Sequence, residues 1–173
     1  MIMSPDVRKL ALTAHITASV GWLGAVAAFL ALAVVGVTSE DAQVVRSAYI
    51  AMGLTGSFVI VPLSFASLLT GLVQALGTKW GLFRHYWVLA KLLINIFANV
   101  VLLMYMPTLS YLASEAGEAK FPGSDLGGLR DPSPVLHSTA ALLLLLVALV
   151  LGVYKPRGMT KYGWRKQYEQ RAA

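Results

Sequence analysis

Two ionisable side chains stand inside apolar stretches of the sequence, and both are suited to binding or redox chemistry. Lys91 lies in the apolar run that begins at Tyr86, and His15 lies in another near the start of the chain. An ionisable residue in a membrane helix costs roughly 2.5–3.5 kcal/mol on insertion scales, so it marks a candidate functional site. Imidazole is the usual axial ligand of haem iron, and four-helix bundles hold cofactors between facing helices. His15 and Lys91 are therefore candidates for one buried cofactor site, with His15 as the ligand of the iron.

Polar side chains recur at helical spacing beside each of these two residues. Ser19 and Trp22 follow the histidine at i + 4 and i + 7, and Asn95 and Asn99 follow the lysine at i + 4 and i + 8. A polar stripe on an apolar membrane helix should face the bundle interior or a cavity. Asn95 fits a cofactor pocket and an interhelical hydrogen bond equally well, whereas Asn99 fits the hydrogen bond better.

The same two residues are predicted to lie at one depth in the membrane. A helix rises about 1.5 Å per residue, which places each of them roughly 10 Å inside the basic end of its helix. On the second apolar segment this depth falls near Ser67, Thr70 and Gln74. The three segments are therefore expected to meet around one site.

The lack of an acidic partner limits the roles open to Lys91. No Asp or Glu lies within the four apolar segments of the sequence. Its ammonium either snorkels to the headgroups along the apolar stem or stays buried. A buried Lys91 is either neutral, and then a second axial ligand for haem, or paired with an anionic ligand. Haem or porphyrin propionates are suitable anions.

A second, weaker candidate site lies at the start of the last apolar segment. His137 is expected on the order of 20 Å from His15 along the membrane normal, so one iron cannot bind both. His137 is more typical of a residue at the membrane–water interface, and haem ligation is the alternative. With Met104 and Met106 it could instead bind copper, because thioethers suit Cu(I).

The elements that must position these residues are membrane helices. The chain has 173 residues, of which 57% are hydrophobic and 13% are charged. Four segments lack acidic residues and exceed the roughly 20 helical residues needed to cross a bilayer. Cysteine is absent, which excludes disulfides, thiolate metal sites and c-type haem attachment. We predict an all-α, single-domain transmembrane four-helix bundle over residues 1–173, with helices at about 5–37, 40–77, 82–113 and 133–154, and a basic tail at 155–173.

Local signals add detail to this scheme. The run Ser4-Pro5-Asp6 predicts a helix start, and residues 38–41 match a capping box that should open the second helix. Pro62 should kink that helix near its middle. The tail carries Tyr162, Trp164 and Tyr168 among basic residues, which is typical of a segment that lies on an anionic membrane surface.

The distribution of charge predicts the orientation. Ten of the 14 Lys and Arg residues fall in the N-terminus, the second connection and the tail, while six of the eight acids fall in the other two connections. By the positive-inside rule both termini are cytoplasmic, and the helices run up-down-up-down through a bacterial inner membrane. The formal charge of +6 is thus explained by the membrane and does not indicate nucleic acid.

Several of these residues form a pattern that resembles one known group of proteins. The shared features are His15, then Gly21-Trp22-Leu-Gly24, then Thr70-Gly71-Leu72, and finally Trp87-Val-Leu-Ala-Lys91. The pattern is similar to small bacterial four-helix membrane proteins that include the haem-binding protoporphyrinogen oxidase and the membrane domain of copper-resistance D-like proteins. The resemblance implies b-type haem, with His15 and Lys91 as the essential catalytic pair.

The function that these observations favour is redox chemistry in the membrane. We predict a b-type haem or porphyrin protein that exchanges electrons with a quinone or oxidises a porphyrinogen. The alternative is a non-enzymatic membrane subunit or a transport protein for a metal or small molecule. Partners would be the lipid bilayer, a porphyrin or quinone, and a second copy or a redox protein. The predicted cofactor-binding residues are His15, Ser19, Trp22, Lys91, Asn95 and His137.

Overall fold

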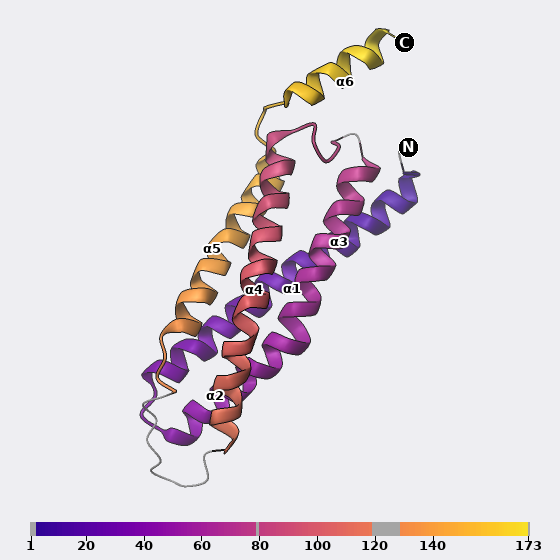
Figure 1. Cartoon of the computed structure of the whole chain (residues 1–173). Coiled ribbons are helices and arrows are strands. Elements are labelled where there is room, and N and C mark those ends of the chain that lie inside the picture. The colour runs from indigo at the N-terminus through magenta and orange to yellow at the C-terminus, as the bar shows by residue number, and fades with distance from the viewer. Residues whose placement is uncertain (1–2, 79, 119–128, 173) are drawn as a thin grey trace.

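The chain forms a multi-pass membrane protein built from long apolar helices. The computed structural model describes residues 3–78, 80–118 and 129–172, and over these ranges it contains helices and no strands (Figure 1). Four helical segments are long and apolar enough to cross a membrane. The elements are α1 (Pro5–Thr38), α2 (Ala42–Thr55), the π-helical turn η1 (Gly56–Ile60), α3 (Val61–Gly77), α4 (Tyr86–Glu118), α5 (Ser133–Tyr154) and α6 (Lys161–Ala172).

Most of the predicted helix bounds hold to within two residues, and α4 is the exception. It begins at Tyr86 rather than near residue 82, because Gly81 adopts a left-handed φ of 61° and turns occupy the connection. It runs to Glu118 rather than ending near residue 113, because Leu112 and Ala116 still pack into the core. Residues 119–128 of the predicted loop lie outside the described residues.

The start of α2 is capped differently from the prediction. Asp41, and not a residue at the front of the predicted capping box, is the N-cap. Its carboxylate accepts from the backbone N–H of Gln43 at 2.8 Å and of Val44 at 3.4 Å. The helix therefore starts at Ala42, slightly later than expected.

Pro62 is accommodated by a change of helix type. A proline inside an α-helix removes one N–H donor, and its ring crowds the carbonyl four residues earlier. Immediately before Pro62 the chain forms η1, where the Val61 N–H bonds the Gly56 carbonyl across a wider turn. Such π-turns accommodate a local break in the regular hydrogen-bond pattern of the helix, and they often occur beside functional sites.

The four membrane-crossing segments pack in a ring. α1 contacts α2, α3 and α5, and α4 contacts the same three helices. The core between them contains large apolar residues such as Trp22, Phe29, Tyr49, Met52 and Leu109. Many large apolar side chains also face outward, including Phe58 and Met104. An apolar exterior is what a bilayer requires, because hydrocarbon replaces water around the bundle.

Specific contacts tie together the elements at each end of the bundle. At one end, here called the termini end, the Met3 N–H bonds the Gly77 carbonyl at 3.1 Å and the Thr160 N–H bonds the Arg84 carbonyl at 3.0 Å. Figure 1 shows both chain termini near this end. At the opposite end, here called the loop end, the Tyr49 hydroxyl donates to the Asp131 carbonyl at 3.4 Å.

The basic tail contains a helix that docks on the connection between α3 and α4. The Thr160 hydroxyl donates to the Phe83 carbonyl at 2.6 Å, and Gly163 of α6 is buried against the Arg84 backbone. Trp164 on the same helix stays exposed. The Lys166 ammonium, 2.7 Å from Glu169, holds the pKa of that carboxyl below its usual range through a hydrogen bond.

Candidate functional site

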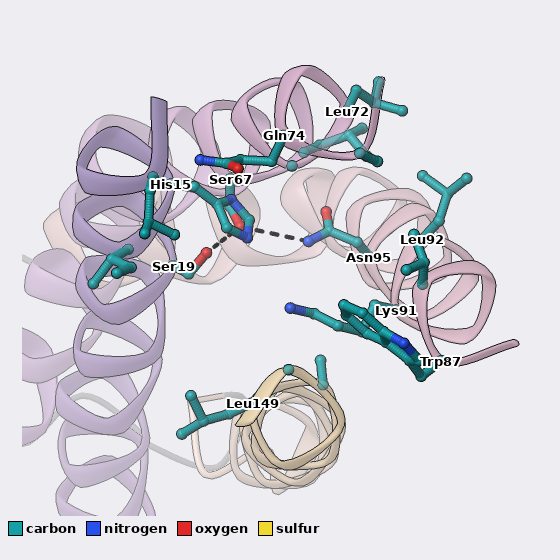
Figure 2. Close-up of a pocket in the computed structure, with 18 of the residues that line it drawn as sticks. His15, Ser19, Ser67, Leu72, Gln74, Trp87, Lys91, Leu92, Asn95 and Leu149 are labelled. Carbon is teal, nitrogen blue, oxygen red and sulfur yellow. Dashed lines mark hydrogen bonds between the residues drawn. The ribbon is translucent and has the colours of Figure 1, made fainter. Parts of the chain in front are cut away.

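A cavity of about 500 Å³ lies near the termini end, between α1, α3, α4 and α5. Its walls are mostly leucine and other apolar side chains, with a small number of polar groups that converge on the interior (Figure 2). This combination is characteristic of sites for small molecules and cofactors. The polar and charged residues of its lining include His15, Ser19, Ser67, Gln74, Lys91, Asn95 and Lys155.

Hydrogen bonding assigns the tautomer of His15. Its Nδ1 lies 3.1 Å from the Thr70 hydroxyl. That hydroxyl donates its own proton to the Ala66 carbonyl at 2.6 Å, so it can only accept from the imidazole. The proton therefore sits on Nδ1, and the lone pair of Nε2 is left for a ligand. A histidine whose Nδ1–H is bonded in this way is oriented for metal ligation.

Two glycines make room for the two ionisable side chains of the cavity. A Cβ added to Gly71 would lie 3.1 Å from Cε1 of His15, so the imidazole rests on bare α3 backbone. A Cβ added to Gly152 would lie 2.8 Å from Nζ of Lys91. The lysine amine therefore reaches across from α4 to the backbone of α5, and Figure 2 shows it pointing into the open space.

The charges lining the cavity are all positive. Lys155 joins Lys91 in the wall, and its Nζ lies 5.4 Å from the ring centroid of Trp80. Among the described residues that line the cavity there is no Asp or Glu. The lysines thus share the space without a protein carboxylate, which is the electrostatic condition for binding an anion.

A short polar network joins three helices beside this cavity. The hydroxyls of Ser19 and Ser67 lie 2.8 Å apart, and the Asn95 amide lies 3.5 Å from Ser67 (Figure 2). Ser67 is buried and connects the face that carries His15 to the face that carries Lys91. The expectation that these three segments meet around one site is confirmed by these contacts and by the shared cavity.

Asn99 belongs to the packed interior and not to the cavity. It is 4% exposed, its amide donates to the Asn95 carbonyl at 2.9 Å, and its oxygen accepts from Ser64 at 2.9 Å. The bond with Ser64 joins α3 to α4, whereas the bond with Asn95 lies within α4. The interpretation of Asn99 as an interhelical hydrogen-bond residue agrees with this geometry.

Some residues that line the cavity were not among the site residues predicted from the sequence. Gly152 of α5 and Lys155, which follows its end, line the cavity. The glycine was the available signal, because a single small residue in a run of bulky ones indicates close approach of another group. Nε2 of Gln74 is buried in the cavity wall with no hydrogen-bond partner among the described residues.

His137 lies in a different part of the molecule from His15. Its ring stacks on Tyr105 with centroids 4.1 Å apart, and its Nδ1 donates to the Ser133 carbonyl at 2.9 Å. Met104 is 75% exposed, and Met106 packs towards Gly56. The structure therefore does not bring these two methionines together with His137 as a three-residue copper site.

Comparisons with protein-family models, curated proteins and solved structures gave no match. The resemblance of the sequence pattern to the haem-binding group therefore stays a prediction.

Proposed function

We propose that the chain is a b-type haem-binding redox protein of a bacterial inner membrane, with the haem in the cavity at the termini end. The observation that carries this proposal is the pairing, in one cavity, of a histidine that donates through Nδ1 and a lysine with no Asp or Glu beside it among the described residues of the lining. The first group suits iron, and the second suits a propionate.

The residues present fit the chemistry of haem. The apolar walls suit the porphyrin ring, His15 supplies an axial nitrogen, and Lys91 and Lys155 supply cations for carboxylates. The buried Gln74 amide gains a partner if an anionic or carbonyl group enters the cavity. Bound haem supplies one-electron chemistry whose potential is tuned by the axial ligand and its surroundings.

The residues around His15 act by orienting it. Thr70 holds Nδ1–H and so fixes the direction of Nε2, while Gly71 lets the ring lie close to α3. Ser67 ties α1 to α3 and α4, which limits relative movement of the elements that carry His15 and Lys91. A rigid surrounding of this kind favours a bound cofactor over loose adsorption.

Buried side chains on the loop-end side of the cavity favour a binding site over a continuous transport path. Asn99 is hydrogen-bonded on both sides, and Trp22, which is 2% exposed, closes the cavity on the side of the loop end. For the same chain we propose the up-down-up-down orientation with cytoplasmic termini, which the excess of Lys and Arg at the termini end favours.

The test is the absorption spectrum of the full-length protein. Protein purified in detergent from haem-replete cells should show a Soret band that shifts on reduction with dithionite. His15→Ala should lose the band, because no other histidine lines this cavity among the residues that the structure describes. His137→Ala, the matched control, should keep it.

Two results would overturn the proposal. The first is a colourless preparation that haemin cannot reconstitute. The second is a spectrum that His137→Ala loses and His15→Ala keeps, which would move the haem to the other end of the bundle.

A further inference from the structure

A second, smaller cavity of about 200 Å³ lies towards the loop end. Its walls come from α1, η1, α4 and α5, and they include the aromatic rings of Trp22, Phe29, Phe97 and Tyr105. Phe97 is 57% exposed and Ala140 is also exposed, so the rim between α4 and α5 faces the bilayer. A ligand dissolved in the lipid can therefore reach this cavity without passing through water.

Hydrogen bonds define the roles of two polar side chains in the lining of this cavity, Ser138 and His137. The Ser138 hydroxyl donates to the Pro134 carbonyl at 2.6 Å and is satisfied. The His137 Nδ1 lies 2.9 Å from the Ser133 carbonyl, which can only accept, so the proton of the imidazole is on Nδ1. Nε2 of His137 is consequently an acceptor, and it selects a ligand that donates a hydrogen bond.

The inner wall of the cavity also touches the proposed haem site. Trp22 lines both cavities and is almost fully buried. Trp22 would thus touch ligands in both cavities. The floor of the second cavity is held by close packing, because a Cβ on Gly56 of η1 would lie 2.6 Å from Leu109.

We propose that this second cavity binds the aromatic head of a membrane-soluble quinol, with a ring hydroxyl donating to Nε2 of His137. The aromatic walls suit a flat ring, and the lipid-facing rim suits its isoprenoid tail. A lipid acyl chain would fill the apolar space but has no group for the histidine. The inference goes beyond the proposed function, because quinol binding here needs neither haem nor His15, although a quinol is a suitable electron donor for haem.

The experiment measures binding of reduced and oxidised quinone to the full-length protein. Quinone-free phosphatidylcholine nanodiscs, with and without protein, are equilibrated without oxygen with decylubiquinol, menadiol or their oxidised forms, and the bound compound is extracted and quantified. We expect saturable binding of at least one of the two quinols above empty discs, and weaker binding of its oxidised form. Failure of both quinols to bind above empty discs, as with a cavity occupied by lipid chains only, overturns the inference.

Two pairs of variants locate the site. Ala141→Phe fills the second cavity and should lower quinol binding at least tenfold, whereas Ala148→Phe, two helical turns away in the wall of the first cavity, should not. His137→Phe keeps a ring to stack on Tyr105 but removes Nε2, so quinol binding should weaken about tenfold and the preference for the reduced form should vanish. His85 lies in the connection between α3 and α4 and does not line the second cavity, so His85→Phe is the control for loss of a histidine elsewhere.

The outcomes separate this inference from the proposed function. The Soret band of the same discs reports on haem, independently of the quinol. Loss of quinol binding in Ala148→Phe but not in Ala141→Phe would place the quinol in the first cavity and overturn the inference. An unchanged preference for quinol in His137→Phe would remove the role assigned to the histidine.

Discussion

The two cavities have one feature in common and differ in almost everything else. Each contains one histidine whose Nδ1–H is bonded to an oxygen of its own surroundings, the Thr70 hydroxyl in one case and the Ser133 carbonyl in the other. The cavity at the termini end adds two lysines and a polar network, whereas the one towards the loop end is apolar apart from His137 and a few hydroxyls. The two histidine sites therefore suit ligands of different charge.

The difference follows from which helices supply the neighbours. Around His15, polar residues of α3 and α4 face inward, and Gly152 allows Lys91 to extend across the gap. His137 stacks on Tyr105, and the other walls of its cavity are mostly apolar residues of α1, η1, α4 and α5. The first environment favours an anionic ligand, because a buried cation without a partner is costly. The second favours a neutral aromatic one.

The largest expected effect comes from reversing the charge of Lys91. Lys91→Glu should lower haem retention at least a hundredfold, because like charges about 4 Å apart repel by roughly 4 kcal/mol at an effective dielectric constant near 20. The measurement is haem content per protein after detergent washing. Lys155→Glu at the end of α5 is the matched control and should cost less, since Lys155 is exposed.

The same variant sharpens the comparison of the cavities. Quinol binding to Lys91→Glu should equal that of the parent protein, because Lys91 does not line the second cavity. Full haem retention by Lys91→Glu would show that the lysine does not face the anionic group.

An intermediate effect is expected from Asn99→Leu, which breaks the hydrogen bonds between the two cavities. The free energy of unfolding should fall by about 0.5–2 kcal/mol, because Ser64 and Asn95 each lose a partner. Unfolding by SDS in mixed micelles, followed by far-UV circular dichroism, measures this change. Haem content should stay within about threefold of the parent.

Asn95→Leu is the comparison for that variant. Asn95 lines the first cavity and lies 3.5 Å from Ser67, so its replacement should lower both stability and haem content. Equal loss of haem in the two variants would contradict the assignment of Asn99 to packing alone.

The smallest effect on either cavity is expected from undocking the tail. A side chain at Gly163 would overlap the Arg84 carbonyl, so Gly163→Val should release α6 and make the tail more sensitive to trypsin. Haem and quinol binding should change less than about twofold, because α6 lines neither cavity. Gly117→Val, at a glycine whose Cβ would meet nothing within 4 Å, should leave trypsin sensitivity unchanged. Loss of haem on undocking would instead make the tail part of the site.

Much of the bundle could be predicted because membrane helices are specified by local composition. Long runs without charge identify the four crossings, and helical spacing predicts that Lys91 and Asn95 share a face. The common depth of His15 and Ser67 follows from helix rise alone. The start of α4 was harder to predict, because it depends on the turn at Gly81.

The sequence by itself determined the number of crossings, the two ionisable residues and the lack of an acidic partner, because these depend on residue type and order along a helix. Only the tertiary structure decided that Gly152 opens a path for Lys91, that Lys155 adds a second cation, and that Tyr105 rather than a methionine faces His137. These relations depend on how each helix is rotated about its axis. That rotation is set by packing against several neighbours at once, and no single helix encodes it.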